Sequence, residues 1–122
     1  MNHFENTMPV SLRVQFRHMP QSRPIKQLVR HLADRLGKFD LQGARCEVVI
    51  DEEHHWSKGG IFRVSVRLSM PGKRLYVANC EEESGSHAFL HSAVRTAFGE
   101  IERQLKKQRR RNYRRKVAEL AA

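Results

Sequence analysis

The spacing of apolar residues constrains the fold of this chain more than any other feature of its sequence. Apolar and polar side chains alternate in residues 10–17, which is the period of a strand with one buried face. The same alternation returns in residues 44–52 and 61–70. Pro71 and Gly72 suit a type II turn, and a fourth strand is predicted after them. The sequence thus predicts four strands, three of them consecutive along the chain.

Two further stretches carry apolar residues at intervals of three and four, the period of an amphipathic helix. The first helix is predicted to begin after the cap residue Ser22, with Pro24 in its first turn and Gly37 at its end. The second carries an apolar stripe from Leu90 to Leu105 and continues into a stretch dominated by Lys and Arg. The order β-α-β-β-β-α indicates an α+β domain in which both helices pack on one face of a four-stranded sheet.

The length of the chain, 122 residues, corresponds to one domain. We expect residues 1–9 to form a flexible N-terminus, residues 10–110 the folded domain, and residues 111–122 a basic helical extension or tail. No run approaches the roughly 18 apolar residues of a membrane span, and the N-terminus lacks the pattern of a signal peptide, so we expect a cytoplasmic protein. Cys46 and Cys80 lack CxxC spacing and are predicted to be small core residues in a reducing compartment.

A strong excess of positive charge indicates a polyanionic partner. The chain carries 23 Lys and Arg against 13 Asp and Glu, which gives a net charge of +10. Phosphate backbones are bound by many Lys and Arg contacts at once, so we predict that the chain binds nucleic acid. A membrane surface is the less favoured partner, because the basic stretch near the C-terminus lacks a face of Trp, Phe and Leu.

Residues 54–60, which read HHWSKGG, raise the question of a metal site. Zinc requires two to four convergent ligands, whereas neighbouring residues at the end of a strand point in opposite directions. The two glycines favour a solvent-exposed hairpin loop instead. In the alternative of an RNA-facing loop, the contact residues are His54, His55, Trp56 and Lys58. Trp56 is expected either to stack on an unpaired base or to pack over the sheet edge.

No combination of residues resembles an active site. The acidic runs at residues 51–53 and 81–83 have no basic or nucleophilic partner at a fixed spacing. His87 and His91 lie one helical turn apart but lack a third ligand. We therefore expect that the protein is not an enzyme and binds no metal, cofactor or small-molecule substrate. A metal-dependent nuclease that uses these two histidines together with those of HHWSKGG is the least favoured hypothesis.

Three stretches, in order along the chain, are similar to those of one known family. They are the histidine-rich loop that leads to Lys58 and Gly59, the hairpin VRLSMPGKRLYV, and RQL before a basic end. With these stretches, residues 10–110 resemble the ribosome hibernation-promoting factors, also called ribosome-associated inhibitor proteins. Better-known short factors of that family carry Tyr-Ala-Ala-Ile-Asp in the last helix, where this chain reads HSAVR at residues 91–95. This difference adds positive charge.

The resemblance implies a fold akin to double-stranded-RNA-binding domains and binding to rRNA of the small ribosomal subunit, in the channel of mRNA and tRNA, so that ribosomes are silenced under stress. It also implies a short form without the family's C-terminal dimerisation domain, monomeric away from the ribosome. The alternative is a DNA-binding or transcription-regulatory protein, because relatives have been named modulators of a sigma factor. The predicted RNA-binding residues are Arg23, Lys26, Arg30, Lys58, Arg63, Arg67, Lys73, Arg74, Arg95, Arg103, Lys106, Lys107, Arg109, Arg110 and Arg111.

Overall fold

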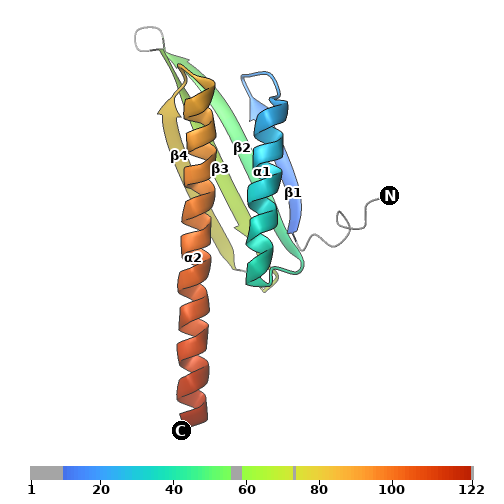
Figure 1. The fold of residues 1–122 in the computed structure, drawn as a ribbon, viewed down its shortest axis with the longest axis vertical. Coiled ribbons are helices and arrows are strands. Elements are labelled where there is room, and N and C mark those ends of the chain that lie inside the picture. Colours follow the sequence, from blue (N-terminus) through green and yellow to red (C-terminus); the bar gives the residue numbers. More distant parts are fainter. Residues whose placement is uncertain (1–9, 56–58, 73, 122) are drawn as a thin grey trace, which may run out of the picture.

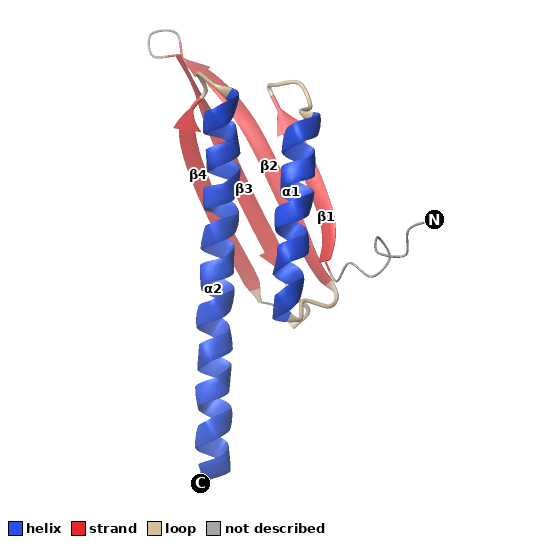
Figure 2. Ribbon diagram, in the orientation of Figure 1, coloured by secondary structure: helices blue, strands red, loops and turns tan. Residues whose placement is uncertain are grey.

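Two helices cover one face of a four-stranded sheet (Figure 1 and Figure 2). The computed structural model describes residues 10–55, 59–72 and 74–121, apart from the side chain of His55. Its elements in chain order are β1 (Val10–Arg17), α1 (Arg23–Arg35), a short 3-10 helix η2 (Leu36–Phe39), β2 (Ala44–His55), β3 (Gly59–Ser69), β4 (Leu75–Glu83) and α2 (His87–Ala121). The α+β class and the predicted order of elements are thus confirmed. The expected N-terminal tail, residues 1–9, lies outside the described residues.

The sheet has the strand order β1-β2-β3-β4. β1 and β2 are parallel, with α1 in the connection between them, whereas β2, β3 and β4 follow one another as antiparallel neighbours. The strand register aligns apolar residues in rows that cross all four strands. Three such rows are Leu12, Cys46, Leu68 and Tyr76; Val14, Val48, Val66 and Ala78; and Phe16, Ile50, Val64 and Cys80. These rows face the helices, and polar residues between them face the other side.

The two helices divide the sheet between them. α1 packs on β1, α2 packs on β3 and β4, and the helices also contact each other. Ser22 caps α1 as predicted, because its hydroxyl accepts a hydrogen bond from the backbone N–H of Ile25 (3.4 Å). The buried residues of α2 run from Leu90 to Leu105, but the helix continues to Ala121 and projects beyond the sheet (Figure 1). No helix of the described residues is both long and apolar enough to cross a membrane.

The end of α1 agrees with the sequence prediction in position, but the chain reverses later than a glycine cap would place it. α1 ends at Arg35, and the chain continues through η2, which contains Gly37, as far as Asp40. Asp40 adopts the left-handed conformation (φ 55°) that helices usually end with at a glycine. The α-helix therefore ends just before Gly37, as predicted, with Leu36 as its C-cap. The chain then continues through a tighter helical turn, so the left-handed residue is Asp40, three residues after Gly37.

The hairpin between β3 and β4 fits the predicted turn, whereas β2 extends further than expected. Gly72 has a φ of 86°, the value that a type II turn requires at its third residue. His54 and His55, predicted in a loop, are instead the last residues of β2 and pair with Gly60 and Gly59. Residues 51–55 are all polar, so no alternation in the sequence indicated that the strand reaches this far.

Both cysteines are free, and neither has the environment of a reactive thiol. Cys46 is fully buried on the inner face of β2, and this burial raises the pKa of its thiol to about 12. Cys80 is half-buried on β4, where burial also raises the pKa of the thiol. Because the thiolate is the nucleophile and metal ligand, both side chains behave as small core residues.

Candidate nucleic-acid interface

The predicted basic residues of α1 line a groove on the side of the helix that faces β1. The groove, called here the α1 groove, has a volume of about 370 Å³ and is lined by Leu12, Val14, Arg23, Lys26, Gln27 and Arg30. The three basic side chains are exposed. Lys26 Nζ donates a hydrogen bond to Gln21 Oε1 (2.6 Å), so its position is held without loss of its charge. An open groove with three cations at its rim suits a phosphate backbone.

A smaller cleft of about 80 Å³ lies between the helices and is called here the interhelical cleft. Its lining residues are Leu32, Arg35, Leu36, Arg95, Phe98, Gly99 and Glu102. Glu102 forms an ion pair with Lys38, and the hydrogen bond from Lys38 lowers the pKa of the Glu102 carboxyl. Arg35 is absent from the predicted RNA-binding set, because the sequence places it on the flank of α1 without showing which neighbour that flank meets. The cleft brings Arg35 together with the predicted Arg95.

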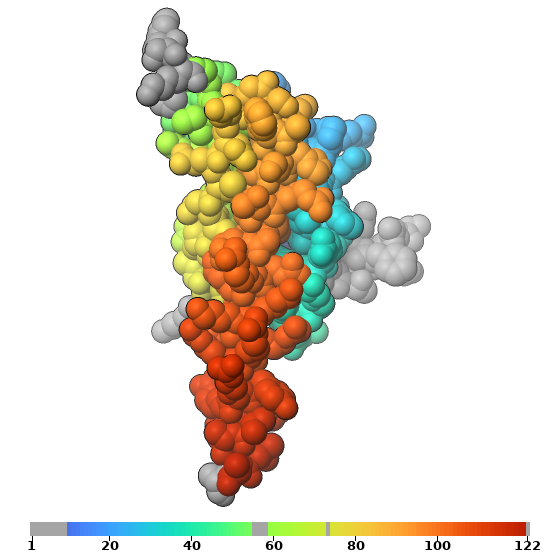
Figure 3. Space-filling view, turned by 60° about the vertical axis from the view of Figure 1, so that its left-hand side comes forward, coloured from blue at the N-terminus to red at the C-terminus, as the bar shows by residue number. Residues whose placement is uncertain are grey.

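The largest group of basic residues lies on the second half of α2. The exposed members from the predicted set are Arg103, Lys106, Lys107, Arg109, Arg110 and Arg111. The group continues with Arg114, Arg115 and Lys116, which are absent from the predicted set. They belong to the same basic run of the sequence, and that run could have predicted them. Figure 3 shows this part of α2 extending beyond the rest of the molecule. Its cations are therefore accessible from several sides of the helix.

Two contacts connect the start of this basic segment to the folded body. The guanidinium of Arg109 lies 4.8 Å from the centre of the Phe39 ring, in a cation–π contact with η2. Arg109 and the predicted Arg74 also line a hollow of about 220 Å³ between the β3–β4 hairpin and α2, together with Phe39 and Tyr76. The basic surface of α2 thus continues onto the end of the sheet at Arg74.

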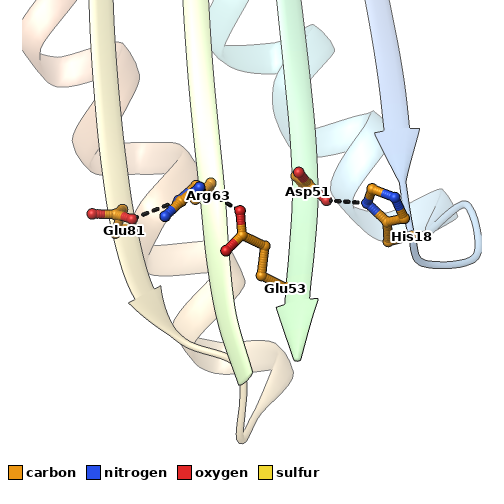
Figure 4. A network of polar contacts seen from close by, with 5 residues as sticks. All are labelled: His18, Asp51, Glu53, Arg63 and Glu81. Atoms are coloured by element: carbon orange, nitrogen blue, oxygen red, sulfur yellow. Dashed lines mark hydrogen bonds and ion pairs between the residues drawn. The ribbon is translucent and has the colours of Figure 1, made fainter. Parts of the chain in front are cut away.

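Arg63 and Arg67 lie on the other side of the molecule, on the sheet face that the helices leave uncovered. The Nε of Arg63 donates to Glu81 (2.6 Å), and its Nη1 donates to Glu53 (Figure 4). The hydrogen bond with Glu81 and the charge of Glu53 raise the pKa of the Arg63 guanidinium. Arg67 is aligned across the sheet with Glu47. Both arginines are thus placed beside carboxylates, away from the helices.

Charges on this outer sheet face are balanced. Its basic residues are Arg13, Arg17, Arg45, Arg63 and Arg67, and its acidic residues are Glu47, Asp51, Glu53, Glu81 and Glu83. The two signs alternate across the strands, as in the row Arg13, Glu47 and Arg67. Such a surface attracts a polyanion weakly, because each cation has a carboxylate within the same patch. The net positive charge of the domain therefore belongs to the helical side.

The histidines of the described residues form no metal centre. The described chain contains no group of three or more His, Cys, Asp or Glu side chains that could hold a metal ion. His54 is exposed, with its Nε2 3.7 Å from Glu52 Oε1, and His18 Nδ1 is 2.8 Å from Asp51 Oδ1 (Figure 4). Of the predicted contact residues, Trp56, Lys58, Lys73 and the side chain of His55 lie outside the described part of the chain.

Comparison with known proteins identifies one family and one fold. The family model described as "Sigma 54 modulation protein / S30EA ribosomal protein" matches residues 12–113. The solved structure of the Thermus thermophilus Protein Y N-terminal domain is similar, with a TM-score of 0.61 and 20% identity, over 78% of this chain and 93% of that one. A ribosomal subunit interface protein from Coxiella burnetii is similar with a TM-score of 0.60 and 13% identity, over 81% and 97%. No curated protein matches the chain.

Proposed function

Because the chain belongs to the sigma 54 modulation protein / S30EA ribosomal protein family, we propose that it is a ribosome-associated factor that binds rRNA of the small subunit. It occupies the channel in which mRNA and tRNA lie and so silences translation under stress. It acts in the cytoplasm as a monomer, without catalysis and without a cofactor. The observation that carries this proposal is the family match over residues 12–113, which covers nearly the whole folded body and the start of the projecting helix.

The names of the similar structures support the same partner. One is an N-terminal domain of Protein Y, and the other is called a ribosomal subunit interface protein. A protein that binds at such an interface meets mostly phosphate and ribose, since RNA helices present their backbones outward. The charged surface of the helical side fits this kind of partner.

The proposed RNA-binding surface lies on the helical side of the domain. It comprises the α1 groove, the interhelical cleft and the basic residues of α2, with Arg74 beside the hollow between the β3–β4 hairpin and α2. The predicted contacts of Lys58 and Lys73 fall outside the described residues. Arg63 and Arg67 are left out of this surface, because the outer sheet face is charge-balanced. Residues 10–110 form the body that docks, and residues 111–122 extend the contact along the RNA.

Sedimentation of ribosomes with the purified protein tests the proposal. We expect the protein to travel with small subunits and with whole ribosomes at low salt, and to remain there when duplex DNA is added as competitor. Recovery in the free-protein fraction at low salt would contradict ribosome association. Equal competition by duplex DNA and by ribosomes would favour the alternative, a DNA-binding or transcription-regulatory protein.

Occupation of the decoding channel is tested separately. Small subunits preloaded with mRNA and tRNA should bind the protein less well than empty subunits, because the ligands and the protein share one site. Conversely, the bound protein should reduce tRNA binding to empty subunits. If preloaded and empty subunits bind the protein equally, the channel is not the site, although ribosome association itself would stand.

A further inference from the structure

Gly99 is an unexpected residue in the middle of a long helix. It lies in α2 between Phe98, which is buried in the core, and Glu100. Glycine is less favourable in a helix interior than every other residue except proline, since it gives up the most backbone freedom. Close packing against a neighbour or an unusual backbone angle would each account for a glycine in such a place.

Neither of these needs explains Gly99. A Cβ atom built on Gly99 meets nothing within 4 Å, so no neighbouring element requires the side chain to be absent. Its φ lies outside the left-handed range, so the backbone does not require glycine. The fold would therefore accept a larger residue here. The missing side chain leaves the helix backbone uncovered at this point, so that another molecule can approach it closely.

The surroundings of Gly99 indicate what that molecule carries. Gly99 is an exposed lining residue of the interhelical cleft, where exposed guanidinium groups come from both helices, Arg35 from α1 and Arg95 from α2. The one carboxylate of the cleft, Glu102, is already paired with Lys38. With Lys38 counted, three cations face one anion around the cleft, so an anionic group is attracted there.

The size of the cleft limits which part of a nucleic acid can enter. Its volume of about 80 Å³ is well below the roughly 300–1,000 Å³ of pockets that enclose drug-sized ligands. A single phosphate group is therefore the part of a nucleic acid that suits it best. Guanidinium groups bind phosphate oxygens through paired hydrogen bonds, and two arginines on opposite walls can hold one phosphate from both sides.

We propose that the interhelical cleft binds one backbone phosphate of RNA between Arg35 and Arg95, and that Gly99 is present so that the sugar–phosphate chain can lie against α2. This inference rests on the proposed function and adds to it a defined contact point.

The variant Gly99→Gln tests the inference, because glutamine favours helix and fills the cleft without changing charge. We expect its melting temperature to rise and its affinity for ribosomes to fall about tenfold or more, the loss expected for one charge-assisted hydrogen bond. Ser92→Gln, on exposed surface of α2 outside the cleft, is the matched control and should keep the parent's affinity. A Gly99→Gln protein that is folded and binds as tightly as the parent would overturn the inference.

The two arginines provide a second measurement that does not depend on how well Gly99→Gln folds. Arg35→Gln and Arg95→Gln should each weaken ribosome binding and reduce the slope of log affinity against log salt by about one. The double variant should lose little more than either single variant if both arginines hold the same phosphate. Unchanged slopes in both single variants would overturn the cleft site. If the parent binds ribosomes in the same assay, that result leaves the proposed function intact, whereas no binding by the parent would remove both.

Discussion

A basic side chain attracts RNA less strongly when neighbouring carboxylates already neutralise its charge. Arg63 and Arg110 illustrate the difference. Arg63 is held by Glu53 and Glu81 on the outer sheet face, whereas Arg110 is an exposed residue of the basic segment of α2. In the sequence the two arginines look equally suited to phosphate, since carboxylates from distant strands are aligned only by the register of the sheet.

The contrast between these two arginines gives the first prediction. Arg110→Gln should reduce the slope of log affinity against log salt by about one, as expected when one phosphate contact is lost. Arg63→Gln should leave that slope unchanged, because its charge is already neutralised by two carboxylates. Filter binding of labelled small subunits over a range of salt concentrations measures both slopes. Equal reductions in the two variants would show that the sheet face also touches the RNA.

Cys46 gives a prediction about pH and stability. Burial raises the pKa of its thiol from 9.0 to about 12. Below about pH 9 the thiol is protonated in both the folded and the unfolded state, so pH has no effect through this group. As pH rises from 9 towards 12, the unfolded chain loses the proton that the folded protein keeps, and the folded state loses stability. The urea midpoint should therefore fall more with rising pH in the parent than in Cys46→Ala. The same fall in both proteins would contradict the assignment.

Residue-level features of the site were only partly predictable from the sequence. The basic residues themselves are visible in the sequence, but the flank of α1 that carries Arg23, Lys26 and Arg30 turns towards β1, away from α2. The sequence alone does not show towards which neighbour that flank turns. Arg35, on the flank that meets α2, was overlooked for the same reason. A helix pattern shows which residues are exposed, but the neighbour on each side depends on the arrangement of the elements.

At the scale of elements, hydrophobic periodicity predicted most of the fold. The alternation in β1 and β3 and the stripe of α2 fixed the order of elements, because each pattern fits only one kind of half-buried element. Strand ends were less predictable. β2 continues through the polar residues 51–55, where backbone pairing with β3 maintains the strand without an apolar pattern. The parallel pairing of β1 with β2 has a separate cause: α1 forms the crossover that connects them.

The length of α2 leads to a prediction about where its stability originates. Ile101 is fully buried against the sheet, whereas Leu120 lies on the projecting end with 81% of its surface exposed. Ile101→Ala should lower the free energy of unfolding by about 2–5 kcal/mol. Leu120→Ala should change it by no more than about 0.5 kcal/mol. Urea denaturation followed by circular dichroism compares the two. A large loss in Leu120→Ala would mean that the projecting end packs on something in solution.

At the scale of the whole molecule, charge is sorted between two faces. The outer sheet face carries five basic and five acidic residues, so the excess that makes up the net charge of +10 lies elsewhere. The helical side concentrates it along α1, in the interhelical cleft and on α2. Sequence composition reveals the excess but not its location, because composition does not show which residues of the fold share a face.

Two variants with equal loss of charge can therefore show whether RNA binding depends on where the positive charge lies or only on how much of it there is. One variant replaces five basic residues of α2 with glutamine: Lys106, Lys107, Arg109, Arg110 and Arg111. The control variant replaces the five arginines of the outer sheet face: Arg13, Arg17, Arg45, Arg63 and Arg67. Both lose the same number of positive charges, and neither touches the buried residues from Leu90 to Leu105. Circular dichroism should therefore report a folded domain in each.

Ribosome binding of these two variants as a function of salt tests the central claim most directly. If the parent neutralises ~6–10 phosphates, its affinity should fall on the order of 10³- to 10⁵-fold between about 50 and 200 mM salt. We predict that the α2 variant binds more weakly with a clearly flatter slope, and that the outer-sheet variant keeps a slope close to that of the parent. If both variants lose affinity and slope equally, net charge alone governs binding, and the claim that the helical side is the RNA-binding surface is wrong.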